Sequence, residues 1–141
     1  MRKHLLYIVF LITSLGFTTK TFAQAEQLSY ICGLYMPPEY ILDGQEYFTR
    51  IKEDQSVEFH STFFSETTYR IVACSNLPNA TVMFSVYDTE KNLLFTNKNH
   101  KYTPYWNFKF KSTVDCIIKV DVISSKQYVP GFVMVQIGFK N

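Results

Sequence analysis

The chain has 141 residues, with 14 basic and 12 acidic side chains and a formal net charge of +2. This near balance excludes the strongly basic surface that recognition of nucleic acid requires, so we expect no nucleic-acid partner. The length accommodates one domain that buries a core of its own, without the metals or dense disulfides of smaller domains.

The N-terminal segment has the three features of a secretion signal. Positions 2–4 are basic, Leu5–Phe17 is an apolar run, and Ala23–Ala25 is an A-x-A-like cleavage site. The apolar run is shorter than the roughly 20 residues of a spanning helix. We therefore predict a signal peptide at 1–25, a single domain at 26–141, and a periplasmic or extracellular product without a stable membrane anchor.

Two alternatives to this cleavage stay open, namely a cut after Ala23 and retention of the segment as an N-terminal anchor. Cleavage after Ala25 takes Arg2, Lys3 and Lys20 from the 14 basic residues and none of the 12 acidic ones, which leaves a nearly neutral mature chain. Its acidic residues concentrate in the first third and its basic residues in the rest. Because the strands of a sandwich interleave, we expect a mixed surface and no charged patch.

The segment 40–52 has two interpretations. It fits a short amphipathic helix, or a first strand with Tyr47, Thr49 and Ile51 on one face. Gly44 weakens a helix, so we favour the strand.

From Val57 onward, apolar residues recur at every second position, the spacing that places them on one face of a strand. Turn-forming residues separate these runs about every ten residues. No helical period lies between the strands, which excludes parallel βαβ units. We predict an all-β fold, an antiparallel β-sandwich or jelly roll of about 7–8 strands. The expected strands after 40–52 are 57–63, 68–74, 82–87, 93–96, 106–111, 116–122 and 132–139.

The strand at 132–139 differs from the others because it is apolar on both faces except at Gln136. A strand of this kind is covered on both sides, so we predict a central position for it. In the strand 68–74, by contrast, the alternation places Ile71 inward and Cys74 on the opposite face.

Three cysteines, Cys32, Cys74 and Cys116, enter a compartment that oxidises thiols, so we expect one disulfide and one free thiol. Spacing does not fix the connectivity. Cys116 lies on the inward face of its strand and Cys74 on the outward face, and we favour the Cys32–Cys74 pair. No histidine or helix start lies nearby to lower a thiol pKa, and no zinc spacing is present. Cys116 is therefore predicted to be a buried structural thiol, and no metal or cofactor is expected.

A series of short segments continues through the second half of the chain: Tyr69-Arg70-Ile71 leading to Cys74-Ser75, Tyr87-Asp88, Leu94–Asn97, Trp106–Phe110 closing on Ser112-Thr113, and Pro130-Gly131. This order resembles a group of uncharacterised bacterial exported β-sandwich proteins, which are similar in layout to the bacterial pre-peptidase C-terminal domains. The resemblance implies an envelope or extracellular location and no activity, since pre-peptidase domains are usually non-catalytic appendages of secreted enzymes. That group has a cysteine soon after the last glycine where this chain has Phe132, so the group's disulfide is not carried over.

The two histidines after the signal, His60 and His100, are the first candidates for a general base. His60 falls on the outward face of its strand between Glu58 and Thr62, and His100 falls in a polar turn. No nucleophile-elbow motif accompanies the serines. We therefore expect no catalytic residues and no enzyme activity.

Paired carboxylates at Glu53–Asp54, or at Glu58 with Glu66, would serve glycoside hydrolysis if the two groups approached each other. We interpret the acids of the turns as turn-forming residues. The loop Asp88–Asn92 lacks the dense alternation of oxygen ligands found in calcium loops, so we predict a plain turn there.

The segment Asn97–Trp106 combines aromatic residues with lysines and a proline. In many β-sandwich proteins, aromatic side chains on a loop beside a sheet stack on sugar rings or bind peptides. Trp106 is in phase with Phe108 and is assigned to the core, which leaves Tyr102 and Tyr105 as the predicted ligand-binding residues.

The sequence thus favours a secreted, non-catalytic binding or structural module whose partner is a glycan or a protein of the cell envelope. The alternative is a small β-barrel-like carrier of an apolar ligand, which would show an interior cavity of several hundred cubic ångströms. A hydrolase ranks third, because nothing in the sequence assembles a nucleophile, a base and an acid.

Overall fold

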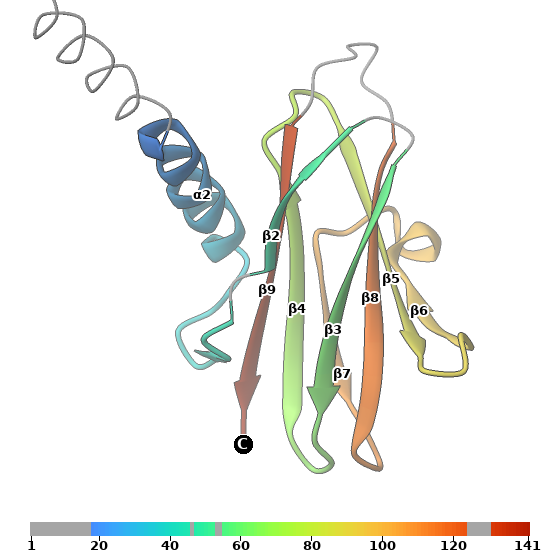
Figure 1. Ribbon diagram of the computed structural model, residues 1–141. Coiled ribbons are helices and arrows are strands. Elements are labelled where there is room, and N and C mark those ends of the chain that lie inside the picture. The colour runs from blue at the N-terminus through green and yellow to red at the C-terminus, as the bar shows by residue number, and fades with distance from the viewer. Residues whose placement is uncertain (1–17, 46, 53–54, 124–130) are drawn as a thin grey trace, which may run out of the picture.

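The computed structural model describes residues 18–45, 47–52, 55–123 and 131–141. Within them one α-helix precedes nine strands, which form two antiparallel sheets (Figure 1). The predicted all-β sandwich is confirmed. The elements are α2 (Thr18–Gly33), β1 (Ile41–Leu42), β2 (Tyr47–Ile51), β3 (Ser56–Phe63), β4 (Thr68–Ser75), β5 (Thr81–Asp88), β6 (Leu93–Thr96), the 3-10 helix η1 (Asn97–His100), β7 (Tyr105–Lys109), β8 (Val114–Ile123) and β9 (Gly131–Lys140).

The five-stranded sheet has the order β1-β9-β4-β7, and β2 also pairs with β9. The four-stranded sheet has the order β3-β8-β5-β6. β9 therefore lies between β4 on one side and both β1 and β2 on the other, which confirms the predicted central strand.

The core fills the space between the two sheets. Alternate residues of each strand face it because successive side chains of a strand point to opposite sides. Ile71 and Cys116 face this core, as predicted, and Trp106 and Phe108 are half-buried and pack against it. Among its fully buried side chains are Phe63, Phe84, Ile118, Val120, Val133 and Ile137.

The segment 40–52 contains the strands β1 and β2, in agreement with the strand interpretation. β2 places Tyr47 and Ile51 in the core, and the helical interpretation is wrong. Gly44 precedes this strand with a φ of 79°, a left-handed backbone that favours glycine and cannot continue a helix.

Helix α2 covers the outer face of the five-stranded sheet and was not predicted. Leu28 and Cys32, one helical turn apart, are fully buried against Val72, Cys74 and Met134 of β4 and β9. β9 is thus covered on both faces, which explains why its sequence is apolar on both.

The predicted signal at 1–25 ends inside α2, and residues 1–17 lie outside the described residues, so the cleavage stays a prediction. No helix among the described residues is long and apolar enough to cross a membrane.

A disulfide links Cys32 of α2 to Cys74 of β4, with the two Cα atoms 5.7 Å apart. This is the pair that the sequence favours. Cys116 is free and buried in the core. Burial and the nearby carboxylates of Asp88 and Asp115 raise the pKa of the Cys116 thiol to about 11.

The disulfide and the buried Cys116 predict how many thiols react in the folded and in the unfolded protein. In the native protein at pH 8 we expect no rapid reaction with Ellman's reagent, because a thiol with a pKa near 11 is ionised in roughly one molecule in a thousand. After unfolding without reductant, one thiol per chain should react. Three reactive thiols, or fast labelling of the folded protein, would contradict this assignment.

Candidate functional site

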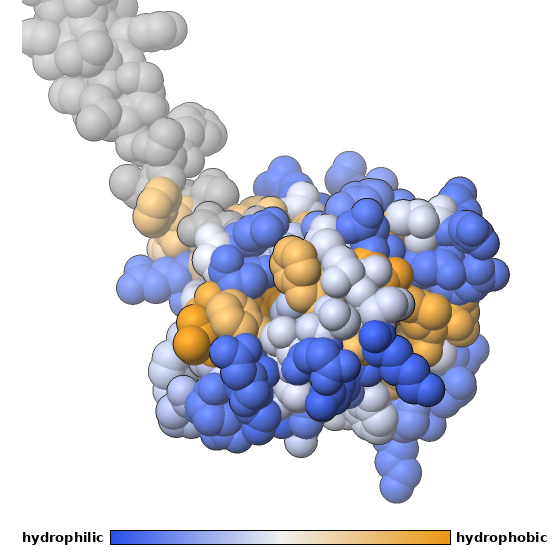
Figure 2. Space-filling view, turned by 90° about the horizontal axis from the view of Figure 1, so that it is seen from below, coloured by the Kyte–Doolittle hydropathy of each residue, from blue (hydrophilic) through white to orange (hydrophobic). Residues whose placement is uncertain are grey.

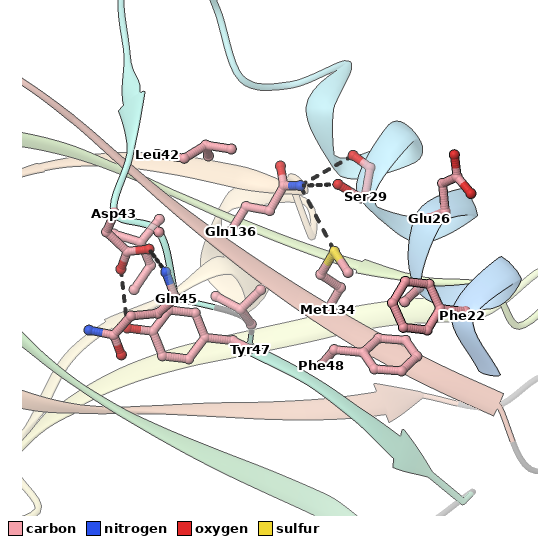
Figure 3. A pocket seen from close by; sticks show the side chains of 14 residues that line it. Phe22, Glu26, Ser29, Leu42, Asp43, Gln45, Tyr47, Phe48, Met134 and Gln136 are labelled. Atoms are coloured by element: carbon pink, nitrogen blue, oxygen red, sulfur yellow. Dashed lines mark hydrogen bonds between the residues drawn. The ribbon is translucent and has the colours of Figure 1, made fainter. Parts of the chain in front are cut away.

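Helix α2 forms a ridge on the outer face of the five-stranded sheet, with a cavity on each side. The first, which we name the Gln136 groove, has a volume of about 580 Å³. It lies between α2, the β1–β2 loop and the middle of β9 (Figure 3). Its walls include Glu26 and Ser29 of α2, Leu42, Asp43 and Gln45 of the loop, Phe48 of β2, and Met134 and Gln136 of β9.

The groove arises from an interruption in the pairing of β9. β1 ends its pairing at Leu42 opposite Gly138, and β2 begins at Tyr47 opposite Val135. Between these points the chain leaves β9, after Asp43 N donates a hydrogen bond to the carbonyl oxygen of Ile137 at 2.9 Å. The side of β9 that would face a continuous neighbouring strand is open to the groove instead.

Gln136 and Asp43 are two of the polar side chains that line this mostly apolar groove. Gln136 is 9% exposed, and its Nε2 donates to the carbonyl oxygen and to Oγ of Ser29, each at 3.2 Å. Its Oε1 is buried and has no hydrogen-bond partner within the described ranges. Asp43 accepts hydrogen bonds from Gln45 N at 3.0 Å and from the Tyr47 hydroxyl at 3.1 Å. Burial raises the pKa of the Asp43 carboxyl, and these hydrogen bonds oppose that rise.

The second cavity, which we name the Tyr102 cavity, has a volume of about 430 Å³. It lies on the other side of α2, between Ile31 and Tyr35 on one wall and the loop Lys101–Pro104 on the other. Lys101 and Tyr102 both have left-handed backbones, with φ of 56° and 54°. The predicted residue Tyr102 therefore does line a cavity.

Tyr105, the other predicted ligand-binding residue, lies on the outer face of β7. Its ring stacks on Tyr35 with 6.1 Å between the centroids, and the Arg70 guanidinium lies 4.3 Å from the Tyr105 ring centre. The structure places Tyr105 in a packed layer next to the Tyr102 cavity, and Tyr102 in its wall. A binding role for either residue stays a prediction.

Asn97 holds the loop that carries Tyr102. Its side chain is fully buried, and Nδ2 donates to the carbonyl oxygens of Val82 at 3.0 Å and Thr103 at 2.9 Å. Its Oδ1 accepts from Phe84 N at 3.0 Å. Three hydrogen bonds from one buried amide thus fix the 3-10 helix and the following loop to β5.

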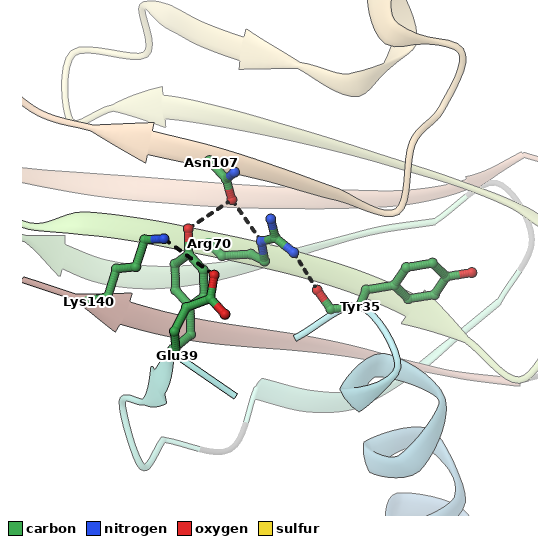
Figure 4. Close-up of polar contacts among 6 residues, drawn as sticks. Tyr35, Glu39, Arg70, Asn107 and Lys140 are labelled. Carbon is green, nitrogen blue, oxygen red and sulfur yellow. Dashed lines mark hydrogen bonds and ion pairs between the residues drawn. The ribbon is translucent and has the colours of Figure 1, made fainter. Parts of the chain in front are cut away.

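Arg70 fastens the segment after α2 to the sheet (Figure 4). Its Nε donates to Oδ1 of Asn107 at 2.7 Å, and its Nη1 donates to the carbonyl oxygen of Tyr35 at 2.9 Å. The guanidinium also lies 5.1 Å from the Tyr40 ring centre, and the Tyr40 hydroxyl donates to Asn107. Sequence reasoning missed this cluster, because it requires the register that places Arg70 opposite Asn107.

The histidines do not form a catalytic site with the neighbours that the structure gives them. His60 is exposed on the outward face of β3, opposite Ile117 of β8. The His100 ring packs on Trp106 with 4.2 Å between the centroids, and also on Phe95. Both therefore have surface or packing roles in this structure.

The carboxylates are dispersed as well. Glu58 lies on β3 opposite Lys119, and Glu66 lies in a turn with a φ of 64°. Glu53 and Asp54 lie outside the described residues. Within residues 18–45, 47–52, 55–123 and 131–141, no group of three or more His, Cys, Asp or Glu side chains could hold a metal ion.

Asp88 closes a turn, as predicted. Its carboxylate accepts from Nδ2 and from the backbone N of Asn92, both at 2.8 Å. These hydrogen bonds hold the pKa of the Asp88 carboxyl below its usual range.

No family model matches the chain, and no curated protein matches it. Among solved structures it is similar to PliG of Aeromonas hydrophila, a periplasmic lysozyme inhibitor of g-type lysozyme. The TM-score is 0.52 at 10% sequence identity, and the match covers 68% of this chain and 85% of that chain. At this identity the likeness shows a shared sandwich fold. The resemblance to pre-peptidase C-terminal domains stays a prediction.

The role of Asn97 is testable by urea unfolding. We expect Asn97→Ala to lower the free energy of unfolding by about 3 kcal/mol, since it leaves buried backbone groups without partners. Asn99→Ala, at an exposed position of the same 3-10 helix, is the control and should change it by less than about 0.5 kcal/mol. Equal effects of the two substitutions would contradict the anchoring role.

Proposed function

We propose that this chain is an exported, non-catalytic module that binds another protein, and that it does so with the outward side of α2 and the adjoining loop. We name this surface the tyrosine patch and define it as Tyr30, Leu34, Tyr35 and Tyr102. All four residues follow Ala25, so the predicted cleavage leaves them in place.

The observation that carries this proposal is the exposure of large side chains at the C-terminal end of α2 and directly after it, where the helix is held firmly to the sheet. Tyr30 is 72% exposed and Leu34 is 66% exposed. The two are four residues apart, and Leu34 N donates to the carbonyl oxygen of Tyr30 at 3.3 Å, so both project from the same side. Tyrosine is enriched among the residues that carry most binding energy in protein interfaces.

The framework beneath the patch is rigid. Cys32 is bonded to Cys74, Leu28 is fully buried, and the carbonyl oxygen of Tyr35 is held by Arg70. A surface that is ordered before binding loses less conformational entropy when a partner arrives, which favours affinity. This arrangement supports a binding function better than a purely structural one.

The fold comparison supports a protein as the partner. PliG, which shares the sandwich, is by its description an inhibitor of a protein, the g-type lysozyme. A sandwich of this kind thus serves as a scaffold for protein binding in at least one periplasmic protein, and g-type lysozyme is the first partner to measure.

The alternatives are less well supported. A barrel-like carrier would hold its ligand inside, whereas these strands form two separate sheets with packed side chains between them. Figure 2 views the lower end of the sandwich and shows its apolar residues as separate spots among more hydrophilic ones. This distribution argues against a large apolar contact surface at that end. A glycan partner stays the alternative for Tyr102, because aromatic rings also stack on sugars.

Binding through the tyrosine patch is tested by surface plasmon resonance and affinity capture with matched variants. The double variant Tyr30→Ser, Leu34→Ser should weaken binding of the captured protein by at least about tenfold. The control Leu93→Ser, Leu94→Ser removes comparably exposed apolar side chains from β6 and should bind as the unchanged protein does.

Two results would contradict the proposal. One is equal binding by both double variants, which would move the interface away from α2. The other is selective binding on a glycan array that the Tyr102→Ala variant abolishes, with no protein captured, which would make a glycan the ligand.

A further inference from the structure

The Gln136 groove lies across α2 from the tyrosine patch and combines acidic and neutral polar groups with apolar walls. The Asp43 carboxylate and the Oε1 atom of Gln136 are hydrogen-bond acceptors, and no lysine or arginine contributes to its described lining. We propose that this groove binds a small organic cation, an ammonium or amidinium group on an apolar arm. This site is independent of the proposed protein interface.

The unpartnered oxygen of Gln136 is the first argument. A buried acceptor without a hydrogen bond destabilises the fold, and buried polar groups in native proteins are seldom left in that state. Its partial negative charge adds to that of Asp43, and the lining around them is mostly apolar, so the attraction for a cation is stronger than on a fully hydrated surface. A cation in the groove is attracted by both groups.

The apolar walls are the second argument. Phe48, Met134 and Leu42 line the groove. The Phe48 ring is fixed by stacking on Phe132, with 5.0 Å between the centroids and parallel planes. With Phe22 and Ala25 in its wall the groove has a volume of about 580 Å³, within the range of small-molecule sites, which combine apolar walls with a few polar groups. The arm of the ligand would contact these walls while its head faces Asp43.

The predicted cleavage after Ala25 determines which carboxylate gives the groove its selectivity for a cation. It removes Phe22 and Ala25 from the wall and creates an α-ammonium group on Glu26, which offsets the charge of the Glu26 side chain. Asp43 and Gln136 belong to the sandwich and stay in place. The selectivity for a cation therefore rests on these two residues.

Three probes of similar size test this proposal by isothermal titration and by 15N amide shifts, with the exported protein purified as it is processed in the cell. 4-Phenylbutylamine should bind about tenfold more tightly than 4-phenylbutanol and 4-phenylbutyrate, since only the amine brings a positive charge to the Asp43 carboxylate. The amine should shift the amide signals of Phe48, Met134 and Gln136.

Two variants separate charge from shape. Asp43→Asn should remove the preference for the amine while the alcohol still binds, which shows that the groove persists. Glu58→Gln removes a carboxylate of the opposite sheet and should leave the preference unchanged. The proposal is overturned if the carboxylate probe binds as well as the amine, if Asp43→Asn keeps the preference, if the shifts map to the Tyr102 cavity, or if the amine does not bind at millimolar concentration.

Discussion

The docking of α2 onto the five-stranded sheet is the constraint on which the functional surfaces depend. Leu28 and Cys32 form the buried contact, and the bond from Cys32 to Cys74 makes it covalent. For a closed loop with a sequence separation of 42 residues, such a bond stabilises the fold by roughly 4 kcal/mol. Without the helix, the outer side of Met134 would be exposed, and neither the Gln136 groove nor the Tyr102 cavity would have its second wall.

The strands were predictable from the sequence because most of them have one buried and one solvent-exposed face. In β8, for example, Cys116 and Ile118 alternate with more exposed neighbours, and this alternation is local information. Helix α2 was not predictable in the same way. Its described residues begin within the stretch that reads as a secretion signal, and its buried side is defined by contacts with β4 and β9, which are distant in sequence.

The candidate sites show the same limit. Tyr102 was found because an aromatic residue in a polar loop is conspicuous. Arg70 acquires its role through strand register, and Asp43 through the break between β1 and β2. Gln136 did carry a signal, as the single polar residue of an otherwise apolar strand. Read as a buried amide that needs partners, it could have indicated the groove before the structure was known.

Amide hydrogen exchange of the variant Cys32→Ala, Cys74→Ala tests the central role of helix docking most directly. We expect the amides from Leu28 to Gly33 to exchange at nearly the rate of an unfolded peptide, while those of β8 in the opposite sheet stay protected. If α2 kept the protection that it has in the unchanged protein, the bond from Cys32 to Cys74 would not be what holds the helix. If β8 lost its protection together with α2, the helix would be part of the core fold and not a separately docked ridge.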